Sequence, residues 1–483
     1  MRKLPRRILI GLVAFIVLLA CAALLAWELI SSALEAQFLT RTAEKLTWRI
    51  EAGPSKRIAW PGQGPYDQRL GYSKLPHYLE RLDRYGWQID SQARISVQMQ
   101  RVSDLGLFLP YHEKDQTGLT VVDSAGRPLY VSRHPQRAYE TFDAIPKVLV
   151  NALLFIENRE LLAEEFPTRN PAVEWDRLAQ ALLEKGISLV DKNRNVPGGS
   201  TLPTQIEKYR HSPEGLTTGM LEKLRQMGTA SLRAYLNGPN TLGMRREIVK
   251  AYLNTVPLAA APRYGEVHGL GDGLHAWYGL DFARANRVLA RAPRDDDHEY
   301  ANMLKHALSL IVAERRPSYY LVANRRALDA YTDDHLDLLA QAGVVPFELA
   351  RLAKSVRLRS IDQRIDPKPP RFVDQKATNA QRIRVTQLLG ETRLYDLDRL
   401  DLKVSTTIHQ PAQKIVSDFL QSLASPQTAA AAGLMGHRLF SPGNPLSKVV
   451  YSFTLYEKTP AGNLLRVQAD NLNQPFDLNS QAR

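Results

Sequence analysis

Four short segments in the middle of the chain hold the residue types that do chemistry. Glu157 is a carboxylate at the end of an amphipathic stretch, where it can accept a proton or a hydrogen bond. Lys208, Lys223 and Arg225 are cations, which form the stronger, charge-assisted hydrogen bonds with phosphate oxygens. By position alone Glu157 would be an ordinary surface glutamate, so its role depends on the motifs around it. The segments are FIENREL (155–161), GGSTLPTQIEKY (198–209), LEKLRQM (221–227), and IVKAYLN (248–254) followed by GLGDGLHAWYGLD (269–281).

The second segment predicts a glycine turn that leads into a helix. Glycines 198–199 permit a close backbone approach, and Ser200 is the residue type expected at a helix N-cap. Thr201, Gln205 and Lys208 follow at i, i+4 and i+7, so they lie on one helical face. The alternative is a capped surface helix with no ligand.

The third segment places Lys223 and Gln226 three residues apart, again on one helical face. Gln226 can donate and accept hydrogen bonds, but it carries no charge.

The elements that position these segments are mostly helices. One helix is expected to begin at Pro146 and to end near Glu157. Its apolar residues recur with the helical period, which predicts one buried face: Leu149, Ala152, Leu153 and Ile156. Helical patterns continue to about residue 360. The run 117–132, TGLTVVDSAGRPLYVS, predicts two short strands joined by a turn, and the proline-rich run 365–372 predicts a seam before a last region.

Composition limits the classes of protein that remain. The chain has 483 residues, more than one ordinary core accommodates, and is globular in composition at 44% hydrophobic and 23% charged. Its formal charge of +13 suits anionic partners such as nucleic acid, anionic lipid or diphosphate, although a merely solvated basic surface has the same signature. The single Cys21 excludes an intramolecular disulfide and any cysteine-based zinc cluster.

The N-terminus predicts a membrane anchor. Residues 8–27 form an uncharged, almost wholly apolar run, and about twenty such residues span a bilayer core as a helix. The basic MRKLPRR precedes this run and Glu28 follows it, so the positive-inside rule keeps the N-terminus in the cytoplasm and exports the body. A cleaved signal peptide and a lipoprotein signal that ends at Cys21 are the alternatives.

In this order the four segments resemble the motifs of the peptidoglycan glycosyltransferases, found in the N-terminal half of class A penicillin-binding proteins. The usual forms of those motifs are EDRRF, GGSTITQQLxKN, RKxxE, ILExYLN and GIxxAAxxYFGKD. A lone GGST also occurs in ordinary turns and helix caps, whereas four motifs in the family order are specific. The resemblance covers residues 118–290.

The resemblance implies a lysozyme-like, mainly α domain that polymerises lipid II. The family's general base aligns with Glu157. It takes a proton from the 4-hydroxyl of the acceptor sugar, which attacks the anomeric carbon of the donor chain as undecaprenyl diphosphate leaves. By the same alignment, the substrate-binding positions are Arg159, Ser200, Thr201, Gln205, Lys208, Lys223, Arg225 and Gln226.

Departures from the family pattern bear on activity. Gln226 stands where the family has a second glutamate, which helps to organise the diphosphate and its divalent cation, Mg or Mn. The resemblance therefore implies a divalent cation, and the missing carboxylate bears on both metal use and turnover. Asn158, Glu160 and Leu161 also replace usual residues around the base, and Lys250 replaces a glutamate in the fourth segment, whose other residues are expected to pack the domain.

The C-terminal part resembles the entry to a penicillin-binding transpeptidase domain. LDLKVSTTIHQPAQ, 400–413, is similar to LxVxTTIDxxxQ, with His409 in place of Asp. No Ser-x-x-Lys sequence occurs in the chain, so the acylation nucleophile of that second activity is missing. The region is expected to be either the start of a longer bifunctional protein or a vestige.

The sequence thus predicts a mainly α, lysozyme-like glycosyltransferase with a small α/β stalk region and an N-terminal transmembrane helix. It is expected in the bacterial inner membrane with its body in the periplasm, acting on lipid II and glycan strands beside other cell-wall proteins, without nucleic acid. The alternatives are an impaired scaffold that binds lipid II or glycan, and a glycan-cleaving enzyme. The expected divisions are a cytoplasmic tail (1–7), the anchor (8–27), a membrane-proximal region (28–117), the glycosyltransferase domain (118–290), a helical extension (291–364), a linker (365–399) and the incomplete transpeptidase-like start (400–483).

Overall fold

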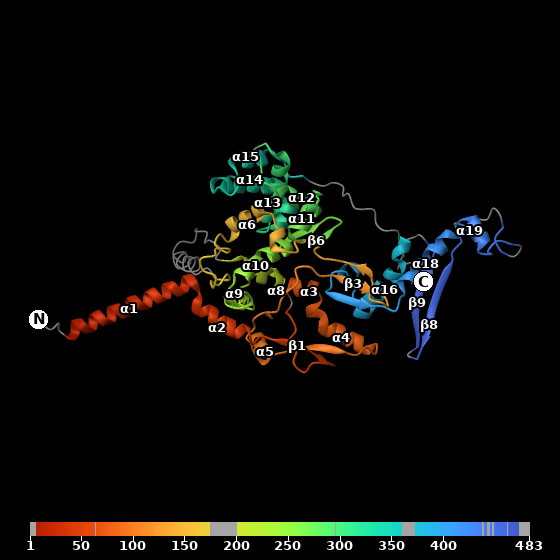
Figure 1. Cartoon of the computed structure of the whole chain (residues 1–483), viewed down its shortest axis with the longest axis horizontal. Coiled ribbons are helices and arrows are strands. Elements are labelled where there is room, and N and C mark those ends of the chain that lie inside the picture. Colours follow the sequence, from red (N-terminus) through yellow and green to blue (C-terminus); the bar gives the residue numbers. More distant parts are fainter. Residues whose placement is uncertain are drawn as a thin grey trace. The chain divides into compact units, whose positions relative to one another are not determined.

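The computed structural model consists mainly of helices with small sheets, which confirms the predicted fold class (Figure 1). It describes residues 6–62, 64–173, 200–294, 296–359, 372–436, 439–441, 445–446, 449–460 and 462–472. The chain divides into two compact units, and each is described by itself. Unit 1 comprises residues 1–68, 88–116 and 135–362, and unit 2 comprises residues 69–87, 117–134 and 363–483.

Unit 1 begins with α1 (Arg6–Ser31), a continuous helix whose segment Leu12–Ser31 is long and apolar enough to cross a membrane. Ser32 has a left-handed backbone (φ 51°) and separates α1 from α2 (Ala33–Ala43). The Glu28 carboxylate accepts hydrogen bonds from the backbone N–H groups of Leu34 and Glu35, at 2.9 and 2.8 Å. Glu28 therefore satisfies donors that the first turn of α2 would otherwise leave without partners.

The membrane-proximal part of unit 1 forms a small α/β region. Strands β1 (Trp48–Ala52) and β2 (Ser91–Ile95) pair antiparallel. Ser96 caps α5 (Val97–Asp104) by accepting from the N–H of Met99 at 3.2 Å. This region packs its own apolar side chains, among them Ile95 and Met99, around Leu232 of α9 (Met220–Ala234).

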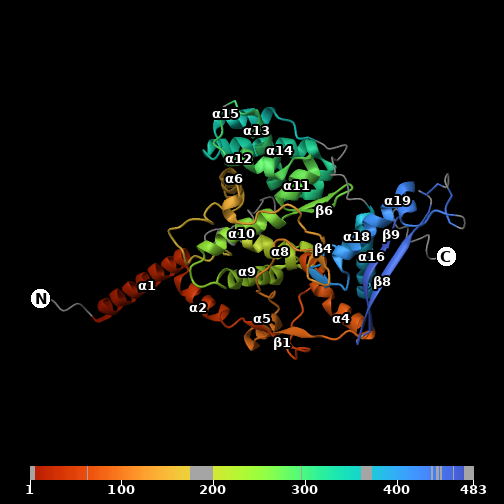
Figure 2. The same cartoon turned by 45° about the vertical axis from the view of Figure 1, so that its right-hand side comes forward.

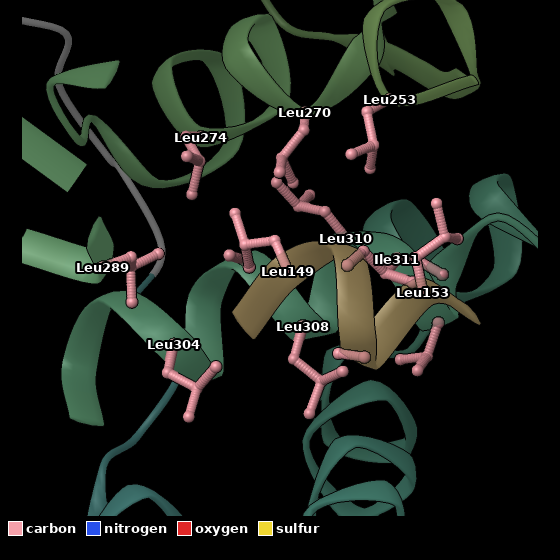
Figure 3. Packing of buried hydrophobic residues seen from close by; sticks show 14 of the residues in the cluster. Leu149, Leu153, Leu253, Leu270, Leu274, Leu289, Leu304, Leu308, Leu310 and Ile311 are labelled. Carbon is pink, nitrogen blue, oxygen red and sulfur yellow. The ribbon is translucent and has the colours of Figure 1, made fainter. Parts of the chain in front are cut away.

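The main core of unit 1 lies around α6 (Lys147–Glu157). Leu149, Ala152 and Leu153 of α6 are buried as their spacing predicts, and Ile156 packs against the same core. Figure 3 shows Leu149 and Leu153 among leucines from the neighbouring helices. The other elements of this part are η2 (Phe142–Ala144), α8 (Leu202–His211), η3 (Pro213–Gly215), α10 (Leu242–Thr255), α11 (Gly269–Tyr278), α12 (Phe282–Ala290), α13 (His298–Ala313), the π-helix η4 (Ser318–Ala323), α14 (Arg325–Gln341) and α15 (Phe347–Ser355).

The helices expected as a separate extension belong to this core. Leu304 and Leu308 of α13, Leu336 of α14 and Leu349 of α15 lie in the same buried cluster as Leu149. Figure 2 shows α12 to α15 grouped together with α11. The structure thus has no boundary at residue 290, because the apolar faces of these helices complete the core rather than form a second one.

One hairpin interrupts the run of helices that the sequence predicts. Strands β5 (Pro257–Ala261) and β6 (Gly265–His268) pair antiparallel between α10 and α11. Gly269 follows with φ +74°, and a Cβ there would lie 2.2 Å from the backbone oxygen of Asn254. Asn254 itself binds the backbone of Tyr139 in both directions, at 2.8 and 2.9 Å. The glycine and asparagine of the fourth segment therefore serve packing at these positions.

A cluster of buried charges joins α8 and α9 to the preceding loop. Glu113 pairs with Arg210 at 2.5 Å, with Arg233 at 2.8 Å and with His211 at 2.5 Å. Burial alone would raise the pKa of Glu113, but the charges of Arg233 and His211 hold it well below its usual value. Burial opposes the charged form of His211 too, yet Glu113 and Asp67 raise its pKa to about 10. All of these side chains lie in unit 1; those of Glu113, Arg210, His211 and Asp67 are almost inaccessible to solvent, and that of Arg233 is 15% exposed.

Unit 2 contains the two strands predicted around the turn at 124–126. Strands β3 (Leu119–Val122) and β4 (Pro128–Val131) pair antiparallel, and β3 pairs parallel with β7 (Leu402–Ser405). Residues 118–134, which the sequence analysis assigned to the glycosyltransferase domain, therefore form a sheet with the transpeptidase-like start. Long-range pairing decides this, since β7 follows β3 by nearly three hundred residues. The proline-rich run 365–371 lies outside the described residues.

The rest of unit 2 packs around this sheet and around a second hairpin. Leu119 and Val121 of β3 share a core with Leu397 and Leu400. Strands β8 (Ser452–Thr459) and β9 (Gly462–Asp470) pair antiparallel, and Val467 of β9 packs with Leu420 of α18. The helices are η1 (Tyr72–Lys74), α4 (Leu75–Arg84), α16 (Phe372–Leu389), α17 (Leu394–Leu397), α18 (Gln410–Ser422) and α19 (Pro426–Ala431), while α3 (Pro65–Arg69) lies at the boundary of the units.

We predict that Glu113→Gln destabilises the protein by about 3–5 kcal/mol, because it leaves buried cations without their carboxylate. The control is Glu348→Gln, since Glu348 pairs with Arg351 on the surface, with side chains 55% and 77% exposed. That variant should change stability by less than about 0.5 kcal/mol. Denaturant unfolding of the purified protein measures both, and similar values for the two variants would contradict the prediction.

Candidate active site

Glu157 is the last residue of α6, and its carboxylate faces the second segment. The helix ends there because Asn158 leaves helical geometry, with φ −160° and ψ 73°. The buried Asn158 side chain accepts from the N–H of Leu202 at 3.4 Å, which ties the end of α6 to the start of α8. Gln205 of α8 then donates from Nε2 to Glu157 Oε2 at 2.8 Å. The structure thus brings together the first two segments that the sequence singled out.

Two residues that the sequence analysis did not assign to the site extend this contact. The Tyr252 hydroxyl donates to Gln205 Oε1 at 3.2 Å. Glu314, the C-cap residue that follows α13, is near enough for its charge to act on Tyr252. Burial, and then the charge of Glu314, raise the pKa of Tyr252 well above its ordinary value. Tyr252 had been expected only to pack, and the YLN motif was its one signal. Glu314 stands in no motif, so the sequence offered no signal for it.

Glu314 is a second carboxylate close to Glu157. Burial, and then the negative charge of Glu157, raise the pKa of Glu314, whereas the positive charge of Lys208 lowers it. A second carboxylate, largely buried, therefore lies near Glu157, with a lysine near it.

A cationic corner contains Ser200, which precedes α8, Lys208 in the last turn of α8, and Lys223 of α9. Lys223 Nζ of α9 donates to Ser200 Oγ at 2.8 Å. Burial, and then the charge of Lys208, lower the pKa of Lys223 to about 8. Two lysines that repel each other beside a hydroxyl form a place where an anion would relieve the repulsion. The structure thus groups Ser200, Lys208 and Lys223, as the sequence led us to expect of ligand-binding residues.

The N-cap of α8 is Thr201, and the prediction of Ser200 as the cap was wrong. Thr201 and Thr204 form a capping box, in which the Thr201 N–H donates to Thr204 Oγ1 at 3.0 Å. Thr201 also donates to the backbone oxygen of Ala172 at 3.1 Å and is 2% exposed. Capping by Thr201 leaves the Ser200 hydroxyl for Lys223, so Thr201 positions the helix while Ser200 faces the lysine. Glycines 198–199 lie outside the described residues.

The remaining predicted residues make other contacts. Arg225 pairs with Glu222 at 3.4 Å, and it is two positions from Lys223, so the two side chains leave α9 in different directions. Gln226 is buried, where its amide donates to Ser212 and to Thr217, both at 2.9 Å. The Arg159 guanidinium lies 4.1 Å from the centre of the Phe155 ring and donates to the Phe155 backbone oxygen.

The donor set fits poorly with the divalent cation that the resemblance implies. Gln226 supplies a neutral amide that neighbouring hydroxyls already engage. Within the described residues, no group of three or more His, Cys, Asp or Glu side chains is arranged to hold a metal ion. Lys208 and Lys223 instead supply positive charge of the protein's own at this place.

Comparison with known protein families identifies the class of this domain. Residues 125–335 match the model of the transglycosylase family, and this stretch contains Glu157 and the other predicted site residues. Residues 125–335 therefore form a domain of the peptidoglycan transglycosylase type. No curated protein is similar enough to the chain to count as a match.

We predict that binding of inorganic diphosphate weakens as pH rises through about 8, the pKa of Lys223. Lys223 is charged below that pH and neutral above it, so the affinity should fall by up to about tenfold per pH unit between pH 8 and 10. Calorimetric titration of the detergent-solubilised protein measures the affinity.

Lys223→Gln should bind more weakly and lose the pH dependence in this range. Lys354→Gln is the control, because Lys354 forms a surface pair with Asp337 at 2.6 Å. It should keep the wild-type profile. A wild-type affinity that stays constant from pH 7 to 10 would show that Lys223 does not contact the anion.

Proposed function

We propose that this protein polymerises lipid II into glycan strands, with Glu157 as the general base. The contact between Glu157 and Gln205, beside the group of Ser200, Lys208 and Lys223, is the observation that carries this proposal. It offers a carboxylate for the attacking hydroxyl and cations for the departing diphosphate within one helical domain. The family to which the domain belongs supports the same class of reaction.

In the proposed reaction Glu157 takes the proton of the acceptor 4-hydroxyl as its oxygen forms a bond to the anomeric carbon of the donor. The bond from that carbon to the diphosphate breaks, and the diphosphate leaves with the electron pair. Lys208 and Lys223 offset the negative charge that develops on it. Gln205 holds the Glu157 carboxylate in position through one oxygen.

The substrate supports a location at the membrane. Lipid II carries an undecaprenyl chain that remains in the bilayer, so an enzyme acting on it works at the membrane surface. Helix α1 has the length and composition to cross a bilayer, and a signal sequence passes the same test. We propose an uncleaved anchor in the bacterial inner membrane, with the body in the periplasm. Other cell-wall synthesis proteins are the proposed neighbours there.

We predict that Glu157→Gln lowers polymerisation of labelled lipid II by at least about 100-fold, the lower range for general-base catalysis. The glutamine keeps the shape of the side chain but cannot accept the proton, so binding of lipid II should barely change. Gel analysis of the glycan products measures the rate, and Glu164→Gln is the control. Glu164 lies outside the motif and is a 75% exposed partner of Arg246, so its variant should polymerise normally.

The products also distinguish the alternatives. If the wild type binds lipid II without elongating it, and Glu157→Gln behaves in the same way, the protein is a binding scaffold. Shortened glycan from isolated sacculi would indicate cleavage instead.

For topology, we predict that a periplasmic reporter fused after residue 40 is active and that a cytoplasmic reporter fused at the same site is inactive. The basic N-terminal flank of α1 retains the N-terminus in the cytoplasm. Activity of a cytoplasmic reporter at the same site, or release of the body by signal peptidase, would contradict the anchor.

A further inference from the structure

Helix α2 has two faces of opposite character. Ala36, Thr40 and Ala43 are spaced at i, i+4 and i+7, and all three side chains are buried. On another side of the helix, Leu34 and Phe38 are 54% and 69% exposed although both side chains are apolar. The exposed side of α2 is therefore suited to an apolar environment.

This exposed side of α2 directly follows the exposed apolar surface of α1. Trp27, Leu29 and Ile30, near the end of α1, are between 37% and 49% exposed. Scattered apolar side chains on the surface of a soluble domain need no explanation. Here, however, the apolar side of α2 begins within one helical turn of a segment that has the length and composition of a membrane span.

Hydrogen bonds hold the junction between α1 and α2 to the rest of unit 1. Thr168 donates from its hydroxyl to the backbone oxygen of Ser31 at 2.8 Å, and Asn170 donates to Glu35 Oε1 at 2.6 Å. Within the junction, the Glu28 carboxylate accepts from two backbone N–H groups in the first turn of α2. The direction of α2 at the end of α1 is therefore fixed by both helices and by the domain.

The buried face of α2 packs on α9, the helix that carries Lys223 of the candidate site. Ala36 forms a buried cluster with Ala234, the last residue of α9, and Tyr235, which follows it. Both views show α2 between the end of α1 and the domain (Figures 1 and 2). Because this face is occupied by the domain, the opposite side of α2 must face outwards.

We propose that the outer edge of α2, formed by Leu34, Phe38 and Arg41, lies in the interfacial layer of the bilayer that α1 crosses. This inference rests on the proposed anchoring of the protein by α1. The three residues fall at i, i+4 and i+7 on one side of the helix, and Arg41 is exposed like the other two. The apolar pair enters the boundary of the acyl chains, while the guanidinium reaches the headgroup phosphates, as in other interfacial helices.

The interfacial position of α2 has a consequence for the candidate site. The anchor is then a rigid arm rather than a loose tether, since α1, the junction and α9 are linked by hydrogen bonds and buried contacts. The domain is held in one orientation on the membrane, and Lys223 stays at a fixed height above the lipid surface.

Spin labels at three equally exposed positions test the proposal in the full-length protein. Leu18 of α1, Phe38 of α2 and Phe347 of α15 are each 69% exposed. Each is replaced in turn by Cys in a Cys21→Ala background, since Cys21 is the only cysteine, and labelled with a nitroxide. The proteins are reconstituted in vesicles of phosphatidylethanolamine and phosphatidylglycerol. Electron paramagnetic resonance then measures collisions with oxygen, which concentrates in lipid, and with a water-soluble nickel chelate.

The label at Phe38 should collide with oxygen more than with the chelate, as the label at Leu18 does, and the label at Phe347 should show the reverse. If the label at Phe38 behaves like the one at Phe347, α2 lies in water and the inference is wrong, while the anchor stands. A Phe38 label shielded from both reagents would indicate a protein partner and would also overturn it. A label at Leu18 that meets the chelate overturns the anchor and the inference together. Polymerisation enters none of these readings, so the role of Glu157 is tested separately.

Glu28→Ala tests whether the junction holds α2 in place. The variant removes the acceptor of two backbone N–H groups, so the label at Phe38 should become more mobile and should meet the chelate more often. The matched control is Glu44→Ala, an exposed glutamate at the C-cap of α2, which should leave the label unchanged. An unaltered Phe38 label in Glu28→Ala would show that the junction does not position α2, and the rigid arm would be wrong.

Discussion

The burial of a polar helix is the constraint on which the rest of unit 1 depends. Helix α8 carries Thr204, Gln205, Glu207, Arg210 and His211, and all of these side chains are buried. Mutational data show that burying a polar group without a hydrogen-bond partner costs about 1–3 kcal/mol of stability. The neighbouring elements must therefore supply a partner for each residue, and those partners define both ends of the helix.

The two ends of α8 solve this constraint differently. At the C-terminal end Arg210 and His211 enter the ion cluster around Glu113, which holds the membrane-proximal part of unit 1 on the helical domain. Towards its N-terminal end Gln205 contacts Glu157 and Tyr252. Lys208, in the last turn, repels Lys223 of α9. In the first set each charged side chain has a partner of opposite charge, which serves stability. The second retains unrelieved charge repulsion, which is where a ligand with opposite charge gains binding energy.

The departures from the family pattern fit this division. Gln226 is enclosed by the hydroxyls of Ser212 and Thr217, so a neutral side chain is matched to a neutral pocket. A second carboxyl group, that of Glu314 at the C-cap of α13, instead lies near enough to Glu157 for the two charges to interact. The charges near Glu157 thus come from different helices than in the family pattern. Lys208 of α8 and Lys223 of α9 supply the positive charge.

The sequence by itself determined the local features of this protein. The period of Leu149, Ala152 and Leu153 predicted the buried face of α6, and the order of four motifs predicted the family and pointed to Glu157. These conclusions depend on spacing within one segment or on motif order, which the chain carries directly. The cap of α8 was placed one residue too early, because Ser and Thr are both good N-caps and only the contact between Thr201 and Thr204 distinguishes them.

Only the tertiary structure decided which distant residues meet. The pairing of β3 with β7 places residues 118–134 in unit 2, although hundreds of residues separate the two strands. Tyr252 of α10 meets Gln205 of α8 because the core packs these helices together, and no spacing within the sequence encodes that approach. Local periodicity is written in neighbouring residues, whereas hydrogen-bond partners and shared burial depend on how the elements pack.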